Sequence, residues 1–403
     1  MRIAKTSDPL GRYYTDSAIA SLLLEAMPDL SPSVAIDLGA GDGVLVREAS
    51  KRWTSTQFVT VDIDKDAASA GLAHLGNRTF RHHVGDALDR KLSQKLDVKL
   101  GHADAALCNP PYIRPRWRKH FGEILEDAGL SHVLPKMRDV PSDLLFIAQN
   151  LRFLKEGGRL GLIVSDGIVA GERYVALRKT LTQCHRIERV IELPRRIFKS
   201  TDAKAHIVVL SKLAEENELV EVHRLEETGR LSKPIQLPSE AVKNRLDYSY
   251  YVNTSQNASP GPTIRQVAIG VSRGVCSSSQ RRNANVPVFH TTDFNADSGW
   301  MPTAFSLSRA LASTWSSSMA QQGDILVARV GRNLEHKVCI VRRGFAVVSD
   351  CVLVLRVHAK YRERVFRFLT SAQGSQALAS ASHGVAARFI TTEALLDIEI
   401  CNE

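Results

Sequence analysis

Short runs of β-branched and other apolar residues alternate with helix-length amphipathic stretches between Val34 and Leu213. Ser142–Leu154 is one such stretch, because its apolar residues recur at helical spacing and Ser142 after Pro141 is a candidate N-cap. Strands that alternate with helices predict a mainly parallel sheet with helices on both faces. The predicted strands are Val34–Leu38, Phe58–Val61, Ala105–Cys108, Leu160–Val164, Val190–Ile191 and Ile207–Leu210.

The pattern changes after Leu213. Residues 215–218 are mostly acidic, and residues 255–262 are rich in Ser, Asn, Pro and Gly, as linkers are. A chain of 403 residues exceeds the size at which single cores stop growing, about 250–300 residues. We therefore expect two domains, residues 1–240 and 241–403. The second domain has predicted strands at Ile325–Val327, Val338–Val341 and Val352–Leu355, then predicted helices at Tyr361–Ser371 and Ser375–Ala381.

The first predicted strand runs into a glycine-rich turn, Asp37-Leu38-Gly39-Ala40-Gly41-Asp42-Gly43. Alternate glycines let the backbone pass close under a ligand, at the end of the strand where open α/β sheets bind ligands. One residue separates the last two glycines, whereas the dinucleotide fingerprint has two, which argues against NAD or FAD. Taken alone, such a turn is also typical of a plain strand-to-helix connection.

Acidic residues follow the next two strands, Asp62 in Val61-Asp62-Ile63-Asp64 and Asp86 in Gly85-Asp86-Ala87-Leu88. Asp62 could accept hydrogen bonds from both ribose hydroxyls of a nucleoside, and Asp86 could meet its adenine amine. Each acid alone is typical of a helix cap, but three acids at successive strand ends, Asp37, Asp62 and Asp86, favour a nucleoside site. An uncharged adenosine moiety fits better than a polyphosphate, because the chain has no Walker-type lysine. The predicted contacts are Asp37, Gly39, Gly41, Asp62, Ile63, Asp86 and Ala87.

Asn109-Pro110-Pro111-Tyr112 follows the predicted strand that ends at Cys108. The prolines fix the backbone, so that the Asn109 side chain and the Pro110 carbonyl can both point outward as acceptors. Two acceptors on one amino group would aim its lone pair at an electrophile, which is the activation that a purine amine needs. Tyr112 would stack on the base. Pro-Pro pairs also stiffen ordinary turns, but the position after a glycine turn and two acids favours a catalytic motif.

With these motifs in this order, residues 10–212 resemble the catalytic domain of gamma-class N6-adenine DNA methyltransferases. The motifs are Gly11-Arg12-Tyr13-Tyr14-Thr15, DLGAGDG, VDID, GDAL, NPPY, and Phe198 ahead of HIVVLSK. The resemblance implies an α/β, Rossmann-like domain with a seven-stranded sheet and a reversed final hairpin. It also implies S-adenosylmethionine as the cofactor, with S-adenosylhomocysteine as the product and no metal.

The resemblance also implies roles for single residues. Tyr14 and Thr15 would contact the methionine part of the cofactor, Asn109 would contact both cofactor and amine, and Phe198 would stack on the adenine. The family usually has proline after that threonine, where this chain has Asp16. Because a base inside a duplex cannot reach such a pocket, base flipping follows.

Residues 245–400 resemble one half of a type I restriction specificity subunit, a target-recognition domain of mixed α+β structure; an unrelated β-rich domain is the alternative. The similarity rests on Arg245–Tyr251, Val286–Phe289, Gly323–Arg329, Ser371–Gly374 and Ile390–Leu395. In this half arginine would read guanine and asparagine would read adenine in the major groove. The candidate DNA-binding residues are Arg281, Arg282, Asn283, Arg329, Arg332 and Asn333; Arg342, Arg343, Arg362, Arg364 and Arg367 are more typical of phosphate contacts or solvated faces.

Composition fits a polyanionic partner. The formal net charge is +10, and release of counterions from phosphates drives the association of basic proteins with DNA; a basic enzyme without such a partner is the alternative. No apolar run reaches the ~20 residues of a membrane span, and no secretory signal begins the chain, so we expect a cytoplasmic protein of bacterial or phage origin. The six cysteines are scattered and form neither a zinc-ribbon nor a redox pair.

The sequence therefore predicts a site-specific adenine-N6 methyltransferase acting on double-stranded DNA. One alternative is an RNA or protein (glutamine) N-methyltransferase, because NPPY also serves those reactions. Another is a DNA-specificity module without catalysis, which the intact NPPY motif disfavours. The chain begins almost at its first motif, so restriction would require a separate endonuclease as partner. It ends without the long spacer helix of specificity subunits, and a monomer is favoured.

Overall fold

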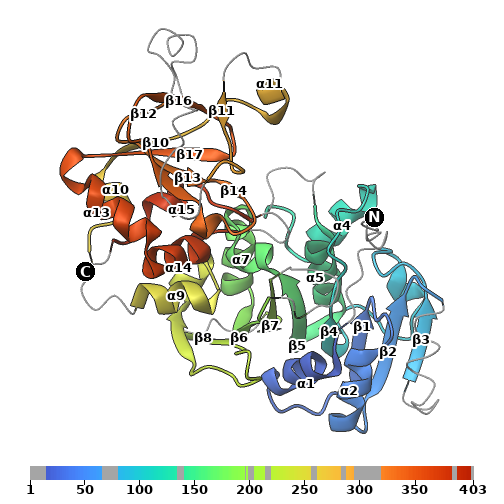
Figure 1. Ribbon diagram of the computed structural model, residues 1–403. Coiled ribbons are helices and arrows are strands. Elements are labelled where there is room, and N and C mark those ends of the chain that lie inside the picture. Colours follow the sequence, from blue (N-terminus) through green and yellow to red (C-terminus); the bar gives the residue numbers. More distant parts are fainter. Residues whose placement is uncertain are drawn as a thin grey trace, which may run out of the picture. The chain divides into compact units, whose positions relative to one another are not determined.

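The computed structural model describes residues 15–65, 80–133, 140–195, 197, 204–213, 219–255, 261–282, 287–294, 319–383 and 388–400. Contacts between residues divide the chain into two compact units, Met1–Tyr248 and Ser249–Glu403. Figure 1 shows the elements of both units in sequence colours. No helix in the described ranges combines the length and the apolar character needed to cross a bilayer.

The first unit contains a nine-stranded sheet in the order β3-β2-β1-β4-β5-β7-β6-β8-β9. Neighbours from β3 to β5 pair in parallel, and β7 lies antiparallel between β5 and β6. The predicted α/β class with a reversed final hairpin is confirmed. The strands are β1 (Val34–Leu38), β2 (Gln57–Asp62), β3 (Phe80–Val84), β4 (Ala103–Cys108), β5 (Leu154–Ser165), β6 (Arg186–Glu192), β7 (Ala205–Ser211), β8 (Leu219–Arg224) and β9 (Ile235–Pro238).

Strands β8 and β9 extend the sheet beyond the expected seven strands. β8 pairs in parallel with the outer edge of β6, and β9 pairs antiparallel with β8. β8 covers backbone groups of β6 that would otherwise form an open edge, and Val220 and Val222 on β8 are buried. The sequence pattern there is short and interrupted by charges, so it did not predict strands.

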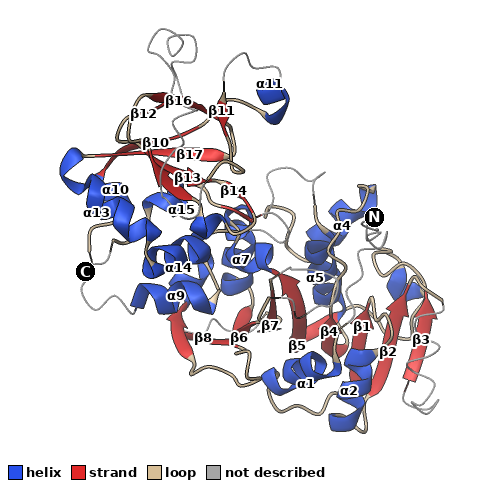
Figure 2. Cartoon of the chain, in the orientation of Figure 1, coloured by secondary structure: helices blue, strands red, loops and turns tan. Residues whose placement is uncertain are grey.

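Helices cover both faces of this sheet (Figure 2). Helices α1 (Ser17–Ala26) and α2 (Val44–Arg52) pack on each other and share a buried apolar cluster with Ala35 of β1 and Leu107 of β4. Helix α5 (Ser142–Phe153) packs on β4 and β5, and all of its residues are buried. Helices α4 (Lys119–Asp127), α6 (Asp166–Ala170), α7 (Val175–Gln183) and α8 (Ser239–Asn244) complete the helices used below.

The start of α5 differs from the prediction. Pro141 occupies the N-cap position in extended conformation, and Ser142 is the first helical residue. The prediction that Ser142 caps α5 is therefore wrong. Its hydroxyl instead bonds to the carbonyls of Pro111 and Ile113 in the loop after β4. A serine hydroxyl has one proton, so it donates to one of these two carbonyls at a time.

The second unit has mixed α+β structure, as predicted. An antiparallel sheet in the order β10-β17-β13-β15 packs with its helices around one apolar core, and a three-stranded sheet of order β11-β16-β12 and a β14-β18 pair lie beside it. The strands are β10 (Ala268–Arg273), β11 (Val288–Phe289), β12 (Met319–Gln321), β13 (Ile325–Ala328), β14 (Val330–Gly331), β15 (Val338–Ile340), β16 (Phe345–Val348), β17 (Val352–Val357) and β18 (Arg388–Phe389). The helices are α9 (Tyr248–Ser255), which begins at the last residue of the first unit, α10 (Ile264–Val267), α11 (Ser278–Arg282), α13 (Ala359–Thr370), α14 (Ala372–Ala381) and α15 (Thr392–Leu396).

Candidate active site

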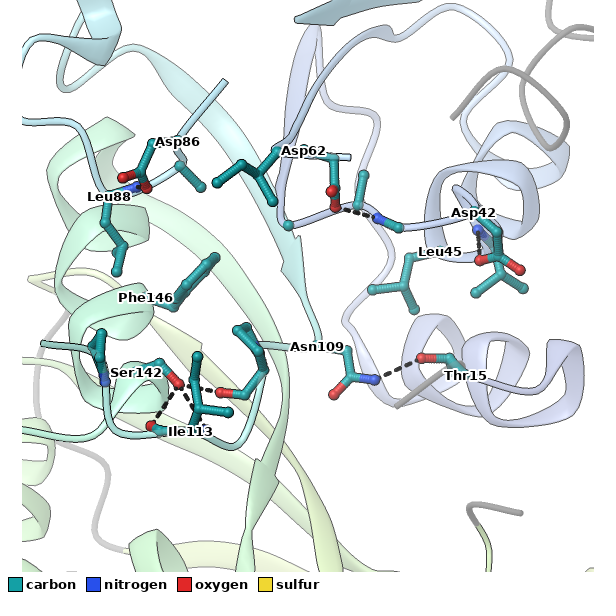
Figure 3. A pocket seen from close by; sticks show the side chains of 18 of the residues that line it. Thr15, Asp42, Leu45, Asp62, Asp86, Leu88, Asn109, Ile113, Ser142 and Phe146 are labelled. Carbon is teal, nitrogen blue, oxygen red and sulfur yellow. Dashed lines mark hydrogen bonds between the residues drawn. The ribbon is translucent and has the colours of Figure 1, made fainter. Parts of the chain in front are cut away.

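A cavity of about 250 Å³ lies beyond the carboxyl ends of β1, β2, β3 and β4 in the first unit (Figure 3). Most of its wall is apolar, and a few polar side chains converge on it, which is the usual form of a small-molecule site. In Figure 3, Asp62 and Asp86 lie at one side and Asn109 with Thr15 at the other. Of the predicted cofactor residues, Thr15, Gly39, Gly41, Asp62, Ile63, Asp86, Ala87 and Asn109 line the cavity.

The glycine turn after β1 forms one wall of this cavity. Gly39, Gly41 and Gly43 all have positive φ, at 80°, 54° and 73°, which is costly for residues with a Cβ. The amide of Gly39 donates to the carbonyl of Val61 at 2.8 Å, which ties the turn to the end of β2. A Cβ on Gly41 would meet no atom within 4 Å, so the space above this residue is open to a ligand.

Asp62 is the last residue of β2, and its carboxylate is held by backbone amides. Gly41 donates to Oδ2 at 2.7 Å, and Asp64 donates to Oδ1 at 2.8 Å. Only 6% of Asp62 is exposed. Each carboxylate oxygen can accept a second hydrogen bond, so the group can take two further donors in a fixed orientation. A pair of neighbouring hydroxyls, as on a ribose, matches this geometry.

Asp86 follows β3 and uses both of its oxygens within the protein. The amide of Leu88 donates to Oδ1 at 2.9 Å, and the guanidinium of Arg118 forms an ion pair with Oδ2. Arg118 also lies 5.6 Å from the centre of the Phe121 ring. Sequence reasoning found Asp86 but missed Arg118, because the two residues are 32 positions apart and nothing in the motif announces the pair. A ligand amine at Asp86 would have to share or displace Arg118.

Asp37 lies within β1, below the turn, and does not line the cavity. It is fully buried, and neither carboxylate oxygen has a hydrogen-bond partner among the described residues. Burial, reinforced by the charges of Asp62 and Asp42, raises the pKa of the Asp37 carboxyl well above its usual range. A buried carboxylate without a donor is costly, so this position favours the neutral, protonated form of Asp37.

Asn109 directly follows β4, and both ends of its side-chain amide are engaged. Its Nδ2 donates to Thr15 Oγ1 at 2.9 Å, and the Tyr112 hydroxyl lies 3.4 Å from its Oδ1. The same Tyr112 hydroxyl lies 3.2 Å from the carbonyl of Ile163. An amide oxygen has two lone pairs and can accept two hydrogen bonds, so Asn109 Oδ1 is not limited to the contact with Tyr112. Pro110 is buried and Pro111 lines the cavity.

Two residues of α5 complete the site, although their sequence pattern predicted no functional role for them. Ser142 fixes the loop after Tyr112, since the Ile113 amide also contacts its hydroxyl at 3.3 Å. The Phe146 ring lies 3.0 Å from the position of a Cβ on Gly39, so it packs directly against the glycine turn. Both residues sit on a helix whose pattern indicated only burial. Their roles depend on contacts with distant segments.

Asp16, which replaces the proline usual in the resembling family, caps α1. Its Oδ1 accepts a hydrogen bond from the amide of Ala18 at 2.9 Å. The backbone of Asp16 has φ −74°, a value that proline also adopts. The departure therefore leaves Thr15 in position beside Asn109.

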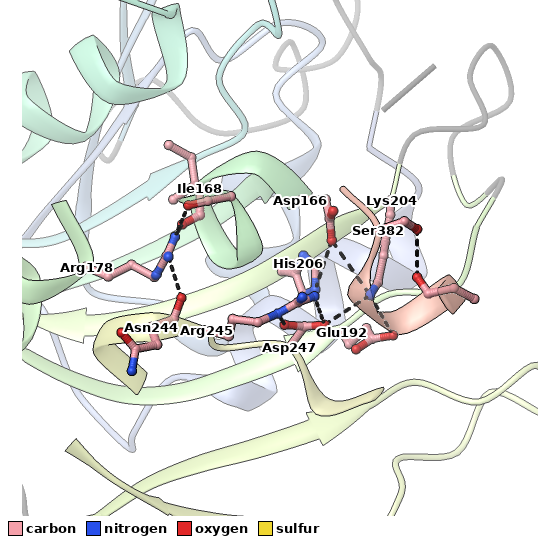
Figure 4. Close-up of polar contacts among 12 residues, drawn as sticks. Asp166, Ile168, Arg178, Glu192, Lys204, His206, Asn244, Arg245, Asp247 and Ser382 are labelled. Carbon is pink, nitrogen blue, oxygen red and sulfur yellow. Dashed lines mark hydrogen bonds and ion pairs between the residues drawn. The ribbon is translucent and has the colours of Figure 1, made fainter. Parts of the chain in front are cut away.

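A second polar group, at the ends of β5, β6 and β7, surrounds Lys204 (Figure 4). Its Nζ lies 3.0 Å from Glu192, 3.7 Å from Asp166 and 3.9 Å from Asp247. Burial alone would lower the pKa of Lys204, but these three carboxylates outweigh burial and raise it. Such charges are tolerated in a protein interior only when paired. These three carboxylates hold in place the side chain of Lys204, the residue that directly follows residues 198–203 in the sequence.

Arg178 of α7 and Lys204 before β7 attach the segment before residue 249 to the rest of the first unit. Arg245 forms a two-bond ion pair with Asp247, both bonds at 2.8 Å, and this pair with Lys204 holds the pKa of Asp247 well below its usual range despite burial. Arg178 is fully buried and donates to the backbone carbonyls of Ile168 and Gly171, both at 2.9 Å (Figure 4). Its Nε also reaches the carbonyl of Lys243 at 3.2 Å.

In the second unit, two predicted DNA-binding segments approach one turn. Arg329 donates from Nε to the carbonyl of Asp350 at 2.8 Å, and Arg281 lies near the same turn, where its charge acts on Cys276 and His290. Arg273, which was not among the predicted DNA-binding residues, also donates to the Asp350 carbonyl, at 2.9 Å. Arg332 and Asn333 are exposed, and Asn333 has φ 52°.

Some of the predicted site residues lie outside the part of the chain that the structure describes. Tyr14, Phe198 and Asn283 lie outside the described residues, and the side chain of Arg282 is likewise outside them. Arg342 and Arg367 both contact Glu363, at 3.5 and 3.6 Å, so these two arginines engage in exposed ion pairs.

Residues 2–233 match the protein family described as N-6 DNA Methylase, a stretch longer than half of the chain. The comparison with curated proteins gave no match. Among solved structures, the type IIG restriction endonuclease BpuSI is 13% identical with a TM-score of 0.53, over 97% of this chain and 59% of that one. The type I restriction-modification methyltransferase subunit from Streptococcus thermophilus is 19% identical with a TM-score of 0.46, over 59% of this chain and 52% of that one. The chain thus spans between half and three-fifths of the length of these two proteins.

Proposed function

Because the chain belongs to the N-6 DNA methylase family, we propose that it methylates the exocyclic amine of adenine in a specific sequence of double-stranded DNA. The observation that carries the proposal is the cavity at the ends of four strands. It brings the glycine turn, Asp62 and Asp86 together with Asn109 of the NPPY motif. Asp62 and Asp86 would bind the nucleoside of a cofactor at one side of the cavity, and Asn109 would orient a target amine at the other. This arrangement suits methyl transfer from an adenosine-containing cofactor to an adenine base.

S-adenosylmethionine fits the residues of this cavity. Asp62 would hold the ribose hydroxyls, with its orientation fixed by the amides of Gly41 and Asp64. Asp86 would meet the adenine amine, and the side chains of Ile63 and Phe146 would pack on the ring. When bound, the cofactor would supply a methyl group on a positively charged sulfur.

Asn109 would orient the target amine. With Nδ2 committed to Thr15, its Oδ1 is the end of the amide that can accept a hydrogen from the amine. The Pro110 carbonyl would accept the second hydrogen. Tyr112 would stack on the base while its hydroxyl donates to the carbonyl of Ile163. Together these contacts would hold the lone pair of the amine toward the cofactor. The bound amine would then need little further ordering before it reacts.

The second unit would select the DNA sequence. In Arg329 the Nε is fixed on the Asp350 carbonyl, while the terminal nitrogens of the guanidinium make no hydrogen bond among the described residues. A guanidinium that is held at Nε and can donate from both terminal nitrogens is able to form the paired hydrogen bonds that read guanine in the major groove. Arg332 and Asn333 would add contacts beside it, and residues 241–403 would thus act as the recognition domain.

The direct test offers the protein three substrate classes. Labelled S-adenosylmethionine is incubated with the full chain and duplex DNA, structured RNA, or a protein fraction containing release factors. We expect label in DNA, recovered as 6-methyladenine at one sequence context. Label in RNA or protein with none in DNA would overturn the DNA assignment. Sequence-specific DNA binding without transfer to any substrate would instead favour a specificity module.

A further inference from the structure

The segment that follows Tyr112 is strongly basic. Residues 113–119, here named the basic loop, read Ile-Arg-Pro-Arg-Trp-Arg-Lys and contain four basic residues and no acidic one. They connect the NPPY motif to α4. None of them belongs to the predicted site residues, because the family motif ends at Tyr112.

The basic loop has two different sides near its start. Pro111, Ile113 and Pro115 line the cofactor cavity. Arg114, between Ile113 and Pro115, and Arg116, directly after Pro115, are exposed and do not line it. The loop therefore presents apolar groups to the cavity and cations to solvent over the same few residues.

Both ends of the basic loop are anchored. At the start, the hydroxyl of Ser142 lies 3.0 Å from the carbonyl of Ile113 and 3.3 Å from its amide (Figure 3). At the far end, Arg118 is ion-paired with Asp86. Pro115 restricts the backbone between these anchors. A loop held in this way loses little conformational freedom when it binds a partner.

Arg116 and Lys119 remain for an external partner. Both are exposed, and neither has a hydrogen bond or ion pair within the described parts of the chain. Lys119 is the first residue of α4, where the helix dipole disfavours a cation. The first turn of α4 contains no acidic residue that would offset it. Because the positive charge of Lys119 lowers the stability of the first turn of α4, its presence there favours a role in binding.

We propose that Arg116 and Lys119 contact the phosphodiester backbone of the DNA strand that carries the target adenine. This inference rests on the proposed function. Four residues span at most about 14 Å, so Arg116 stays close to the base held at Tyr112. The phosphates that flank this base belong to the same strand and follow one another along it at ~3.4 Å of helix axis. The basic loop would therefore hold the backbone beside the flipped nucleotide, independently of the sequence read by the second unit.

The test uses the full chain with the double substitution Arg116→Ala and Lys119→Ala. The matched control is Arg230→Ala with Lys233→Ala, which removes the same charge from two exposed residues between β8 and β9. Binding to a fluorescent duplex is measured between about 50 and 200 mM salt, with and without the methylated sequence. Methyl transfer and S-adenosylmethionine binding are measured on the same samples.

We expect the loop variant to show a slope of log K against log salt that is shallower by about 2, since each phosphate contact contributes about 0.9. Its affinity should fall by a similar factor on both duplexes, with KM for DNA raised, kcat at saturating DNA retained, and cofactor binding unchanged. A slope and affinity equal to those of the control would overturn this inference while wild-type DNA methylation stands. Binding of RNA but not DNA by the wild type would overturn both it and the proposed function.

Discussion

The side-chain amide of Asn109 donates to the hydroxyl of Thr15 at 2.9 Å, across 94 residues of sequence. Thr15 is nearly buried, at 8% exposed, so this bond is shielded from water. An amide whose nitrogen is committed in this way cannot turn over without losing the bond. Its oxygen is therefore kept as the acceptor on the other side, where the target amine is proposed to lie.

Removing the Thr15 hydroxyl should leave the side-chain amide of Asn109 without a fixed orientation. Thr15→Val keeps the shape of the side chain but leaves Asn109 Nδ2 without its acceptor. We expect kcat for methyl transfer to fall about tenfold to a hundredfold, or ~1.4–2.7 kcal/mol in activation free energy. Thr15→Ser should retain most of the rate. Single-turnover kinetics separates this effect from cofactor binding, and equal rates for the valine and serine variants would argue against it.

Asp62 should matter for cofactor affinity. Asp62→Asn places an amide NH₂ against one of the two backbone amides that now donate to the carboxylate, so one contact becomes repulsive. We expect the Kd for S-adenosylmethionine, measured by calorimetry, to rise by one to two orders of magnitude, at about 1.4 kcal/mol for each. Glu227→Gln, an exposed residue of the same charge, is the control. Unchanged affinity in Asp62→Asn would show that the cofactor binds elsewhere.

Arg329 should affect sequence selection more than overall DNA affinity. Arg329→Lys keeps the positive charge but removes the two-pronged fork that distinguishes guanine. We expect discrimination between the methylated sequence and a single-base variant to fall by ~1–3 kcal/mol, with little change in non-specific binding. Competition binding measures both quantities. Arg367→Lys, an exposed substitution on α13 paired with Glu363, should leave discrimination intact.

His185 predicts a loss of stability in mild acid. Its Nδ1 accepts a hydrogen bond from the amide of Leu213 at 3.1 Å, and burial, then Lys212, lowers its pKa from 6.5 to about 4. Between these values the unfolded chain binds a proton that the folded chain does not. The contribution is therefore fully present above about pH 6.5 and is lost as the pH falls through about 4. The loss would be up to about 3 kcal/mol.

Urea unfolding at a series of pH values tests this prediction. His185→Asn can keep an acceptor for Leu213 but does not titrate in this range. Its free energy of unfolding should change less than that of the wild type between pH 6.5 and 4. Parallel pH profiles for the two proteins would contradict the assignment to His185.

Local patterns were sufficient for much of the fold. The buried runs at Val34–Leu38 and Ala105–Cys108 predicted β1 and β4 because a central parallel strand is apolar on both faces. The glycine turn and the acids after the strands were also visible, since each lies in a short contiguous motif. The order of strands then places these motifs at one sheet edge. Eight predicted cofactor residues consequently line one cavity.

Features that depend on distant contacts were not predictable in this way. Arg118 pairs with Asp86, Ser142 holds the loop after Tyr112, and Lys204 is surrounded by three carboxylates. Each of these side chains is an ordinary polar residue in its own segment. Strand β8 was missed for a similar reason, because its pairing with β6 rather than its own pattern stabilises it.

The most direct test of the account is methyl transfer by Asn109→Ala compared with the wild type. The same samples are used to measure S-adenosylmethionine binding and thermal unfolding, and the labelled nucleoside is identified. We expect 6-methyladenine from the wild type and a loss of at least a thousandfold in kcat for the variant, about 4 kcal/mol, with folding retained. Wild-type-like formation of 6-methyladenine by Asn109→Ala would contradict the proposed role of the NPPY motif.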